Sequence, residues 1–451
     1  MRIKVMKFGG TSVATPEARN QAVLRVISAK EQGFMPVVVV SAIGRKGAPY
    51  ATDTLLNLLR DVDPHTIPEP RELDLLIACG EILSAVIFAH SLKSQGHLAH
   101  AFRGGQAGIR TDGVYGNARI TTINPSSLLR CAESGAIPVV CGFQGVFVDG
   151  TTGPGGELTT LGRGGSDTTA AALGCAMKAE CVEIYTDVDG VKTADPDAVS
   201  NAPTLSQITY DEVAEIAHLG AKVVHPRAAE IAMKTKLPLW IKNTFSDHSG
   251  TLIIDRSQKT GRQLTGVAHT GQLVYLQFNL DRVSPSARAE LEAKIYEMMS
   301  KNDVNLYMVN VSPNGTGFGI PRTQLRAVDD LLDALVIPVE EDGKSIVHIL
   351  QLGSSPSQAV TTQTELLGPL GEVRIITVDR TEGCTMVSLV GDEKMREPGL
   401  FFGVLSTLYE HQIPVLQTSD SDLSLSVLVP ESDCLRAVRL IHDKYQLEQV
   451  T

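Results

Sequence analysis

Residues 159–190, TTLGRGGSDTTAAALGCAMKAECVEIYTDVDG, contain one complete helix and strand of an α/β protein. A glycine-rich bend leads into a run of small helix-forming residues, 166–179, and the pattern at 181–190 is that of a strand ending in an acidic loop. A glycine-rich bend in front of a helix is a place where protein chains bind anions. The stretch therefore predicts a helix and a strand of a layered domain, with an anion-binding turn beside them.

The same alternation extends through the first half of the chain. Further strand patterns occur at 3–8, 35–42, 136–146 and 237–243, and helical periodicity occurs at 14–33, 71–96 and 209–235. The continuous valines at 37–40 suit a strand that is covered on both faces. We therefore expect an α/β domain with a doubly wound, mostly parallel sheet.

Size and charge narrow the class of protein. A chain of 451 residues is long enough for two or three domains, and its net charge of −11 argues against nucleic acid or an anionic membrane as the main partner. Its seven cysteines are scattered without a CxxC pair, so we expect free thiols in a reducing compartment. The N-terminus does not resemble a signal peptide, and no apolar run reaches the ~20 residues that span a bilayer. These features predict a cytoplasmic protein.

The pattern changes after about residue 245. Turn residues and charges at 245–266 indicate a domain boundary, and the tetrapeptide Leu-Arg-Ala-Val occurs at 325 and again at 435 within a similar order of helices and strands. We infer an internal repeat of a small ferredoxin-like βαββαβ unit, and we interpret 352–371 as a loop or linker. The expected domains are 1–250 (catalytic), 251–264 (linker), 265–340 (first repeat unit), 341–380 (linker or insertion) and 381–451 (second repeat unit).

The motif KFGGTSV, residues 7–13, ends the first strand. Gly9 and Gly10 would let backbone N–H groups approach a phosphate, and Lys7 would reach the charge of a transferring phosphoryl group. The pattern is not a Walker loop. An ordinary strand-to-helix turn with a solvated lysine is the alternative.

In the bend at 160–170, the glycines and an N-cap from Ser166 or Asp167 would suffice for a structural turn. A turn does not need an arginine, however. Arg163 is suited to bind a substrate carboxylate with two hydrogen bonds, and Asp167 to organise lysines or a metal near phosphates.

Other charged residues are candidate functional residues with less specific sequence patterns. The acidic loop at 185–196 follows a strand, where α/β sheets bind nucleotides, and its spacing is not that of an EF-hand. Glu81 interrupts an apolar helix, where a carboxylate needs a partner. Lys222 and His225 follow a helical stretch. Solvated or structural roles are the alternatives for all of these.

Taken together, several motifs resemble those of the aspartate kinases of the amino acid kinase family. They are KFGGTSV, VVVVSAIG, TDTLL, CGE, TTLGRGGSDTT, YTDVDGVKTADP and GAKVVHPRA, in this order. The downstream repeat resembles the paired ACT domains of those enzymes. Residues 43–56, IGRKGAPYATDTLL, are most similar to the diaminopimelate-pathway isozymes of Gram-positive bacteria.

The resemblance implies ATP-dependent phosphorylation of aspartate, with Mg²⁺ bridging the phosphates rather than held directly by protein ligands. It implies that Lys7 and Asp167 are catalytic. The implied substrate-binding residues are Ser41, Thr52, Glu81, Arg163, Gly164, Gly165 and Ser166. The implied ATP-binding residues are Lys7, Phe8, Gly9, Gly10, Thr186, Asp187, Lys192, Asp195, Asp197 and Lys222. ACT units bind amino acids between subunits, so a feedback-regulated homodimer is implied, with an effector site edged by Val304, Val309, Gln417, Ser419 and Asp420.

Some positions depart from the family pattern. Asp197 stands where the family usually has arginine, and the first repeat unit lacks the glycine that normally opens the effector-binding helix, whereas EPGLFFGVL at 397–405 retains it. A catalytically weak amino-acid sensor therefore remains an alternative. A kinase for another acceptor, such as glutamate or UMP, is a second alternative, although those kinases lack tandem ACT units.

Overall fold

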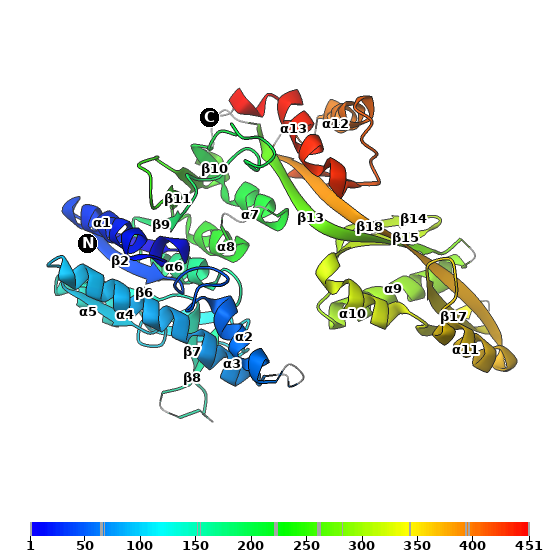
Figure 1. Ribbon diagram of the computed structural model, residues 1–451, viewed down its shortest axis with the longest axis horizontal. Coiled ribbons are helices and arrows are strands. Elements are labelled where there is room, and N and C mark those ends of the chain that lie inside the picture. The colour runs from blue at the N-terminus through cyan, green and yellow to red at the C-terminus, as the bar shows by residue number, and fades with distance from the viewer. Residues whose placement is uncertain are drawn as a thin grey trace. The chain divides into compact units, whose positions relative to one another are not determined.

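The computed structural model describes residues 2–63, 66, 68–150, 152–153, 155–220, 224–258, 263–281, 283–341, 344–392, 395 and 397–449 (Figure 1). The chain divides into two compact units. The first contains the chain up to Pro196, residues 201–266 and a C-terminal stretch from Gln446, and the second contains Asp197–Ser200 and Val267–Tyr445.

A sheet of eight strands forms the centre of the first unit, as far as the described residues show, in the order β10-β12-β11-β9-β1-β2-β6-β3. The strands are β1 (Ile3–Phe8), β2 (Met35–Val40), β3 (Ala99–Phe102), β6 (Ile137–Cys141), β9 (Cys181–Thr186), β10 (Gln207–Thr209), β11 (Leu239–Asn243) and β12 (Thr251–Ile254). Only the β11–β12 pair among these is antiparallel. The expectation of a mostly parallel sheet is confirmed.

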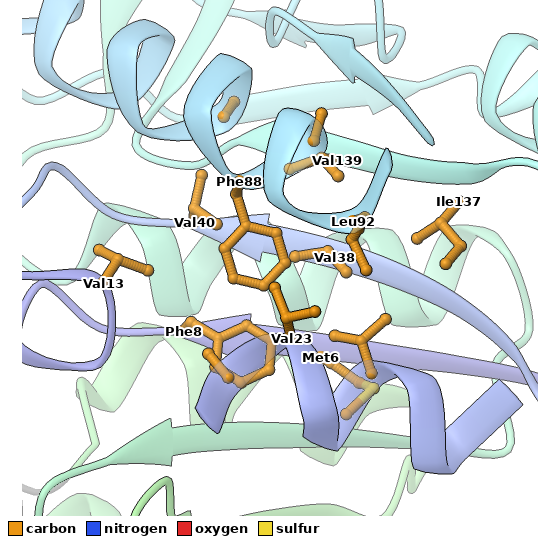
Figure 2. Close-up of a cluster of buried hydrophobic side chains, with 14 of the residues drawn as sticks. Met6, Phe8, Val13, Val23, Val38, Val40, Phe88, Leu92, Ile137 and Val139 are labelled. Carbon is orange, nitrogen blue, oxygen red and sulfur yellow. The ribbon is translucent and has the colours of Figure 1, made fainter. Parts of the chain in front are cut away.

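Helices cover both faces of this sheet. Alternate side chains of β1 and β2, among them Met6, Phe8 and Val38, pack with Val23 of α1 (Pro16–Glu31) and Phe88 of α4 (Cys79–Ser94) in one buried cluster (Figure 2). On the opposite face lies α6 (Gly165–Ala176), where a Cβ added at Gly174 would lie 2.5 Å from Val182 Cγ2. Helices on both faces make this a doubly wound fold.

A smaller sheet and further helices complete the first unit. The sheet has the order β5-β4-β7-β8, with β4 (Ile109–Thr111), β5 (Ile120–Ile123), β7 (Gln144–Phe147) and β8 (Glu157–Thr160). The remaining helices are α2 (Thr52–Val62), α3 (Pro70–Ile77), α5 (Ser126–Glu133), α7 (Tyr210–His218) and α8 (Pro226–Thr235).

Helices α3 and α4 follow one another so closely that Pro70–Ser94 is long and apolar enough to cross a membrane by length and composition. The sequence did not lead us to expect such a segment. Half of its most apolar window, 50%, is buried inside the protein, and core helices of soluble proteins meet the same criterion. The segment is therefore weak evidence for a membrane span.

The second unit contains helices and one long sheet. The main path has the order β14-β15-β13-β18-β17-β16, and β20 pairs with β18 and β19. Its strands are β13 (Leu264–Asn279), β14 (Tyr307–Ser312), β15 (Gly315–Pro321), β16 (Val336–Glu341), β17 (Lys344–Leu352), β18 (Glu372–Gly391), β19 (Gln417–Asp420) and β20 (Ser424–Pro430). Its helices are α9 (Pro285–Lys301), α10 (Leu325–Leu332), α11 (Gln358–Leu367), α12 (Pro398–Glu410) and α13 (Cys434–Lys444).

The element order in the second unit repeats. From β13 to β16 the order is βαββαβ, and from β18 to α13 it is βαββα, which agrees with the expected ferredoxin-like repeat. Figure 1 shows β13 and β18 as long neighbouring strands. A core cluster that includes Phe278, Leu291 and Phe318 joins the sheet to α9.

The structure differs from the sequence interpretation in several places. The interpretation of 352–371 as a loop is wrong because Ser357 caps α11 there, and β17 and β18 run parallel on either side. The segment expected as the linker 251–264 contains β12, which pairs into the first sheet. The strand pattern at 136–146 forms two strands, since Phe143 has a φ of 69° between β6 and β7. The other domain boundaries stay predictions.

Candidate active site

The parallel strands β1, β2 and β9 end at the same edge of the first sheet, and their loops meet there. The N–H of Gly9 donates to the carbonyl of Tyr185 at 3.1 Å, which joins the loop after β1 to the end of β9. Lys7 is the last but one residue of β1. This edge is where open α/β sheets bind ligands.

Gly10 packs backbone to backbone against the loop that follows β2. Its carbonyl accepts from the N–H of Gly44 at 3.0 Å, and a Cβ on Gly10 would lie 2.3 Å from the carbonyl oxygen of Gly44. The contact therefore requires glycine at position 10. It holds the two loops together beside Lys7.

A cavity of about 460 Å³ opens at this edge, within the first unit. It brings together ten of the residues that the sequence proposed: Lys7, Gly10, Ser41, Thr52, Glu81, Arg163, Gly164, Gly165, Ser166 and Asp167. The cavity thus combines a lysine, an arginine and carboxylates. This combination suits a small ligand that carries charges of both signs.

Lys7 and Asp167 form an ion pair across the cavity wall. Lys7 Nζ lies 2.7 Å from Asp167 Oδ1, and the two side chains are 11% and 13% exposed. Asp167 occupies the first turn of α6, where the helix dipole favours a carboxylate. The pair fixes the ammonium group of Lys7 at the end of β1.

Glu81 is a buried carboxyl group in the first turn of α4. Its Oε1 accepts from the N–H of Ala42 at 3.0 Å, while its buried Oε2 has no hydrogen-bond partner among the described residues. Burial raises the pKa of Glu81 to about 8. A cation bound in the cavity would supply the missing partner and restore the charged form.

Arg163 is exposed at the bend before α6. The next residue, Gly164, has a φ of 67°, and a Cβ there would lie 2.1 Å from Cγ of His225. His225 caps α8 by accepting from the N–H of Arg227 at 3.4 Å, and burial lowers its pKa. The bend that carries Arg163 therefore rests on a histidine held against α8.

Asp74 is a cavity residue that the sequence reasoning missed. It is fully buried, accepts from the N–H of Gly116 at 3.0 Å and receives both the N–H and the hydroxyl of Thr160, at 2.8 and 2.7 Å. Its signal in the sequence is a carboxylate on the apolar side of α3, three residues before Ile77. Asp74 joins α3 to the smaller sheet of the first unit and shapes the cavity wall.

The loop after β9 carries its own network. Arg45 Nη2 lies 3.0 Å from Asp187 Oδ2, and the hydroxyl of Thr186 donates to Asp187 Oδ1 at 3.1 Å. Asp189 accepts from Ser246 and Asn243, and these hydrogen bonds lower its pKa. Sequence reasoning did not identify Arg45, which pairs with Asp187 only through the fold.

Phe8 and Lys192, two further nucleotide candidates, do not line the cavity. The ring of Phe8 is buried and stacks with Phe88 and Tyr185, so Phe8 offers only its backbone. Lys192 Nζ donates to the carbonyl of Ala202 at 3.0 Å.

For three more predicted ATP-binding residues, the structure gives no contact with the cavity among the described residues. Asp195 is half-buried, and Asp197 is grouped with the second unit. Lys222 lies outside the described residues.

The proposed effector residues lie in the second unit. Val304 is buried just before β14, Val309 on β14 is 49% exposed, and Gln417, Ser419 and Asp420 lie on β19. Strands β14 and β19 are in contact, and Gln417 Nε2 donates to the hydroxyl of Tyr275 at 3.1 Å. The structure thus brings the two proposed edges to neighbouring strands.

Comparisons with known proteins agree with this architecture. Residues 2–243 match the amino acid kinase family, and residues 379–443 match the ACT domain. Aspartokinase 1 of Bacillus subtilis (strain 168) is 36% identical over 455 residues, covering 100% of each chain.

Solved structures share the fold. E. coli aspartokinase III, solved with aspartate and ADP in the R-state, has a TM-score of 0.70 at 23% identity and covers 98% of this chain and 99% of its own. The same enzyme solved with lysine and aspartate in the T-state has a TM-score of 0.69 at 22% identity, with coverage of 98% and 99%. The chain therefore belongs to the amino acid kinase family, as an aspartokinase with C-terminal ACT domains.

Proposed function

We propose that the cavity binds L-aspartate with its ammonium group on Glu81 and its α-carboxylate on Arg163. The chain, as an aspartokinase, transfers the γ-phosphoryl group of ATP to the β-carboxylate of aspartate and forms 4-phospho-L-aspartate. The observation that carries the proposal is the buried Oε2 of Glu81, which lacks a partner among the described residues in the cavity that Arg163 also lines. Ser41, Thr52, Gly164, Gly165 and Ser166 surround the same substrate.

ATP binds at the ends of β1 and β9 in this proposal. The backbone of Phe8, Gly9 and Gly10 approaches the phosphates, and Lys7 faces the γ-phosphoryl group. Thr186, Asp187, Lys192 and Asp195 form the nucleotide side, and roles for Asp197 and Lys222 in ATP binding stay predictions from the family resemblance. The hydrogen bond from the N–H of Gly9 to the carbonyl of Tyr185 supports this arrangement, because it connects the loop after β1 to the end of β9.

Catalysis rests on positioning and charge. The β-carboxylate of aspartate is already ionised near neutral pH, so no base has to remove a proton before it attacks the γ-phosphorus. Lys7 stabilises the negative charge that spreads over the phosphoryl oxygens, and Asp167 keeps the lysine ammonium in place. Glu81 and Arg163 orient the substrate for in-line attack.

Mg²⁺ is expected to bind through the ATP phosphates. Mg²⁺ commonly takes most of its ligands from phosphates and water. Asp167, beside Lys7, would be placed for a water-mediated contact with the ion. When bound, the ion neutralises charge on the β- and γ-phosphates.

We further propose regulation through the ACT domains. An amino acid produced from phosphorylated aspartate, such as lysine, diaminopimelate or threonine, would bind near Val304, Val309, Gln417, Ser419 and Asp420. The reaction is the first step towards lysine, threonine and methionine. The proposed protein is a cytoplasmic homodimer. Its catalytic domain spans 1–250, its ACT units span 265–340 and 381–451, and the segment 341–380 lies between the two ACT units in the sequence.

The activity is tested by trapping the acyl phosphate. The full chain is incubated with ATP, Mg²⁺ and hydroxylamine, and with aspartate or glutamate as acceptor. UMP is tested by formation of UDP, because a phosphoanhydride gives no hydroxamate. We expect a hydroxamate with aspartate alone. Its absence with aspartate under all salt and metal conditions would favour a catalytically weak sensor, and a hydroxamate with glutamate instead would favour another acceptor. Adding lysine, threonine or diaminopimelate to the same assay identifies the effector.

A further inference from the structure

A second cavity lies in the first unit, on the smaller sheet. It has a volume of about 330 Å³ and is formed by the loop between β3 and β4, by β4 and β7, and by Gly155, Gly156 and Leu158. It shares no lining residue with the cavity around Lys7 and Glu81. Its size lies at the lower end of ligand cavities, which suits a small molecule.

The charges of this cavity are all of one sign. Arg103 and Arg110 are its only charged lining residues among those described, in a chain whose net charge is −11. Neither guanidinium group has a hydrogen bond or ion pair within the described part of the chain. Two arginines without a carboxylate beside them make the cavity attractive to an anion.

The walls around the two arginines are fixed by hydrogen bonds. Gln144 is 1% exposed, and its Nε2 donates to the carbonyl of Ala78 at 3.1 Å. Gln106 Oε1 accepts from the backbone N–H of Arg103 at 3.0 Å, which ties the base of that arginine to its loop. A preformed wall lowers the entropy cost of binding a ligand.

Glycine opens the rim of the same cavity. A Cβ added at Gly155 would have no heavy atom within 4 Å, so the backbone there faces open space. The neighbouring Gly156 has a φ of +66°, and a Cβ at that position would lie 2.5 Å from the carbonyl oxygen of Phe147, so the backbone of Gly156 packs closely against that of Phe147. The N–H of Gly156 donates to the carbonyl of Gly153 at 2.9 Å, so the uncovered backbone at this rim is that of Gly155.

We propose that this cavity is a binding site for a small phosphate-bearing ligand. Arg103 and Arg110 would each pair with phosphate oxygens through the guanidinium fork, which is suited to bidentate contacts with phosphate. The site is separate from the proposed aspartate and ATP pocket, and it does not depend on the proposed function.

Pyrophosphate is the probe for this site, with isothermal titration of the full chain as the measurement. The wild type is expected to bind pyrophosphate at two kinds of site, one at Lys7 and one in this cavity. The double variant Arg103→Gln with Arg110→Gln should bind pyrophosphate in this cavity about 30-fold more weakly, or weaker still. Lys7→Gln should retain pyrophosphate binding in this cavity. Arg119→Gln, an exposed arginine outside both cavities, is the matched control and should bind as the wild type does.

Two further measurements keep the test decisive. Arg103→Lys with Arg110→Lys preserves the charges and the fold but removes the forks, and it should weaken pyrophosphate binding by about tenfold. Unchanged stoichiometry and affinity in the glutamine double variant would overturn the proposal. Tighter binding of malonate than of pyrophosphate at this site would overturn the assignment to phosphate.

Discussion

The ammonium nitrogen of Lys7 lies 2.7 Å from Oδ1 of Asp167, and this ion pair joins the end of β1 to the first turn of α6. Both side chains are largely buried, so the ammonium group is held in one place before substrate binds. Preorganised charge of this kind lowers the barrier to phosphoryl transfer, because the protein does not have to reorganise during the reaction.

Replacement of Lys7 by glutamine is expected to lower kcat by about 10²–10³, the usual effect of losing one preorganised donor. Asp167→Asn should lower kcat by about tenfold or more, since Lys7 loses its anchor. The hydroxamate assay measures both rates. Lys4→Gln, at the other end of β1 where Lys4 pairs with Glu183 at 3.1 Å, should reduce stability and leave kcat nearly unchanged. An unchanged kcat in Asp167→Asn would contradict the role of the pair.

The bend at Gly164 is expected to tolerate no side chain. Gly164→Ala combines a positive φ of 67° with a Cβ 2.1 Å from His225, and it should lower the free energy of unfolding by about 2–4 kcal/mol. Gly33→Ala is the matched control, because Gly33 has a φ of +83° and open space around it. It should cost only about 1–2 kcal/mol. Urea unfolding of both variants measures the difference, and equal losses would show that the contact with His225 does not matter.

Glu81 is expected to lower the stability of the ligand-free protein as the pH rises above 4.5. Burial raises its pKa from an ordinary 4.5 to about 8, so the native state keeps a proton that the unfolded chain has released. The free energy of unfolding contributed by this group therefore falls as the pH rises from 4.5 to about 8.

Glu81→Gln removes that titration and should stabilise the protein by on the order of 3 kcal/mol near pH 7, with little effect near pH 4.5. Urea unfolding across this pH range measures the effect. Glu31→Gln, at the exposed end of α1, serves as the control. A gain that is independent of pH would rule out titration of Glu81 as its source.

Aspartate binding is expected to release a proton from Glu81. The ammonium group of the substrate favours the charged carboxylate, so its binding lowers the pKa of Glu81 from about 8. Calorimetry at pH 7 in buffers of different ionisation enthalpy should detect release of close to one proton per site, and the affinity for aspartate should rise with pH up to about 8. Glu81→Gln should release none. Proton release that persists in this variant would place the titrating group elsewhere.

Local patterns of the sequence were sufficient to predict the main sheet, and together with the family resemblance they named ten residues that line the cavity. The strand at 3–8 and the buried valines of β2 form as expected, because each pattern reflects a strand covered on both faces. Glu81 was recognisable because a carboxylate within an apolar helix needs a partner. Arg163 and Asp167 were recognisable since a turn alone does not require them.

Features that depend on distant partners were not predictable in the same way. Asp74 is held by Thr160, and Asp187 by Arg45, and only the fold brings these pairs together. Strand β12 is short and lies in a stretch rich in turn residues, so its pairing with β11 left little trace in the sequence. The sequence of helix α11 does not predict a helix clearly, because its three threonines and its valine are weak helix formers.

The central claim is that Arg163 binds the α-carboxylate of aspartate, and the direct test is to measure KM for aspartate and for ATP in Arg163→Ala. Loss of a charge-assisted bidentate contact should raise KM for aspartate by about 100-fold and change KM for ATP by less than about threefold. Arg163→Lys should raise KM for aspartate by less than Arg163→Ala does. Arg60 is an exposed arginine on α2, and Arg60→Ala should leave both KM values unchanged. An equal rise in both KM values for Arg163→Ala would contradict the assignment.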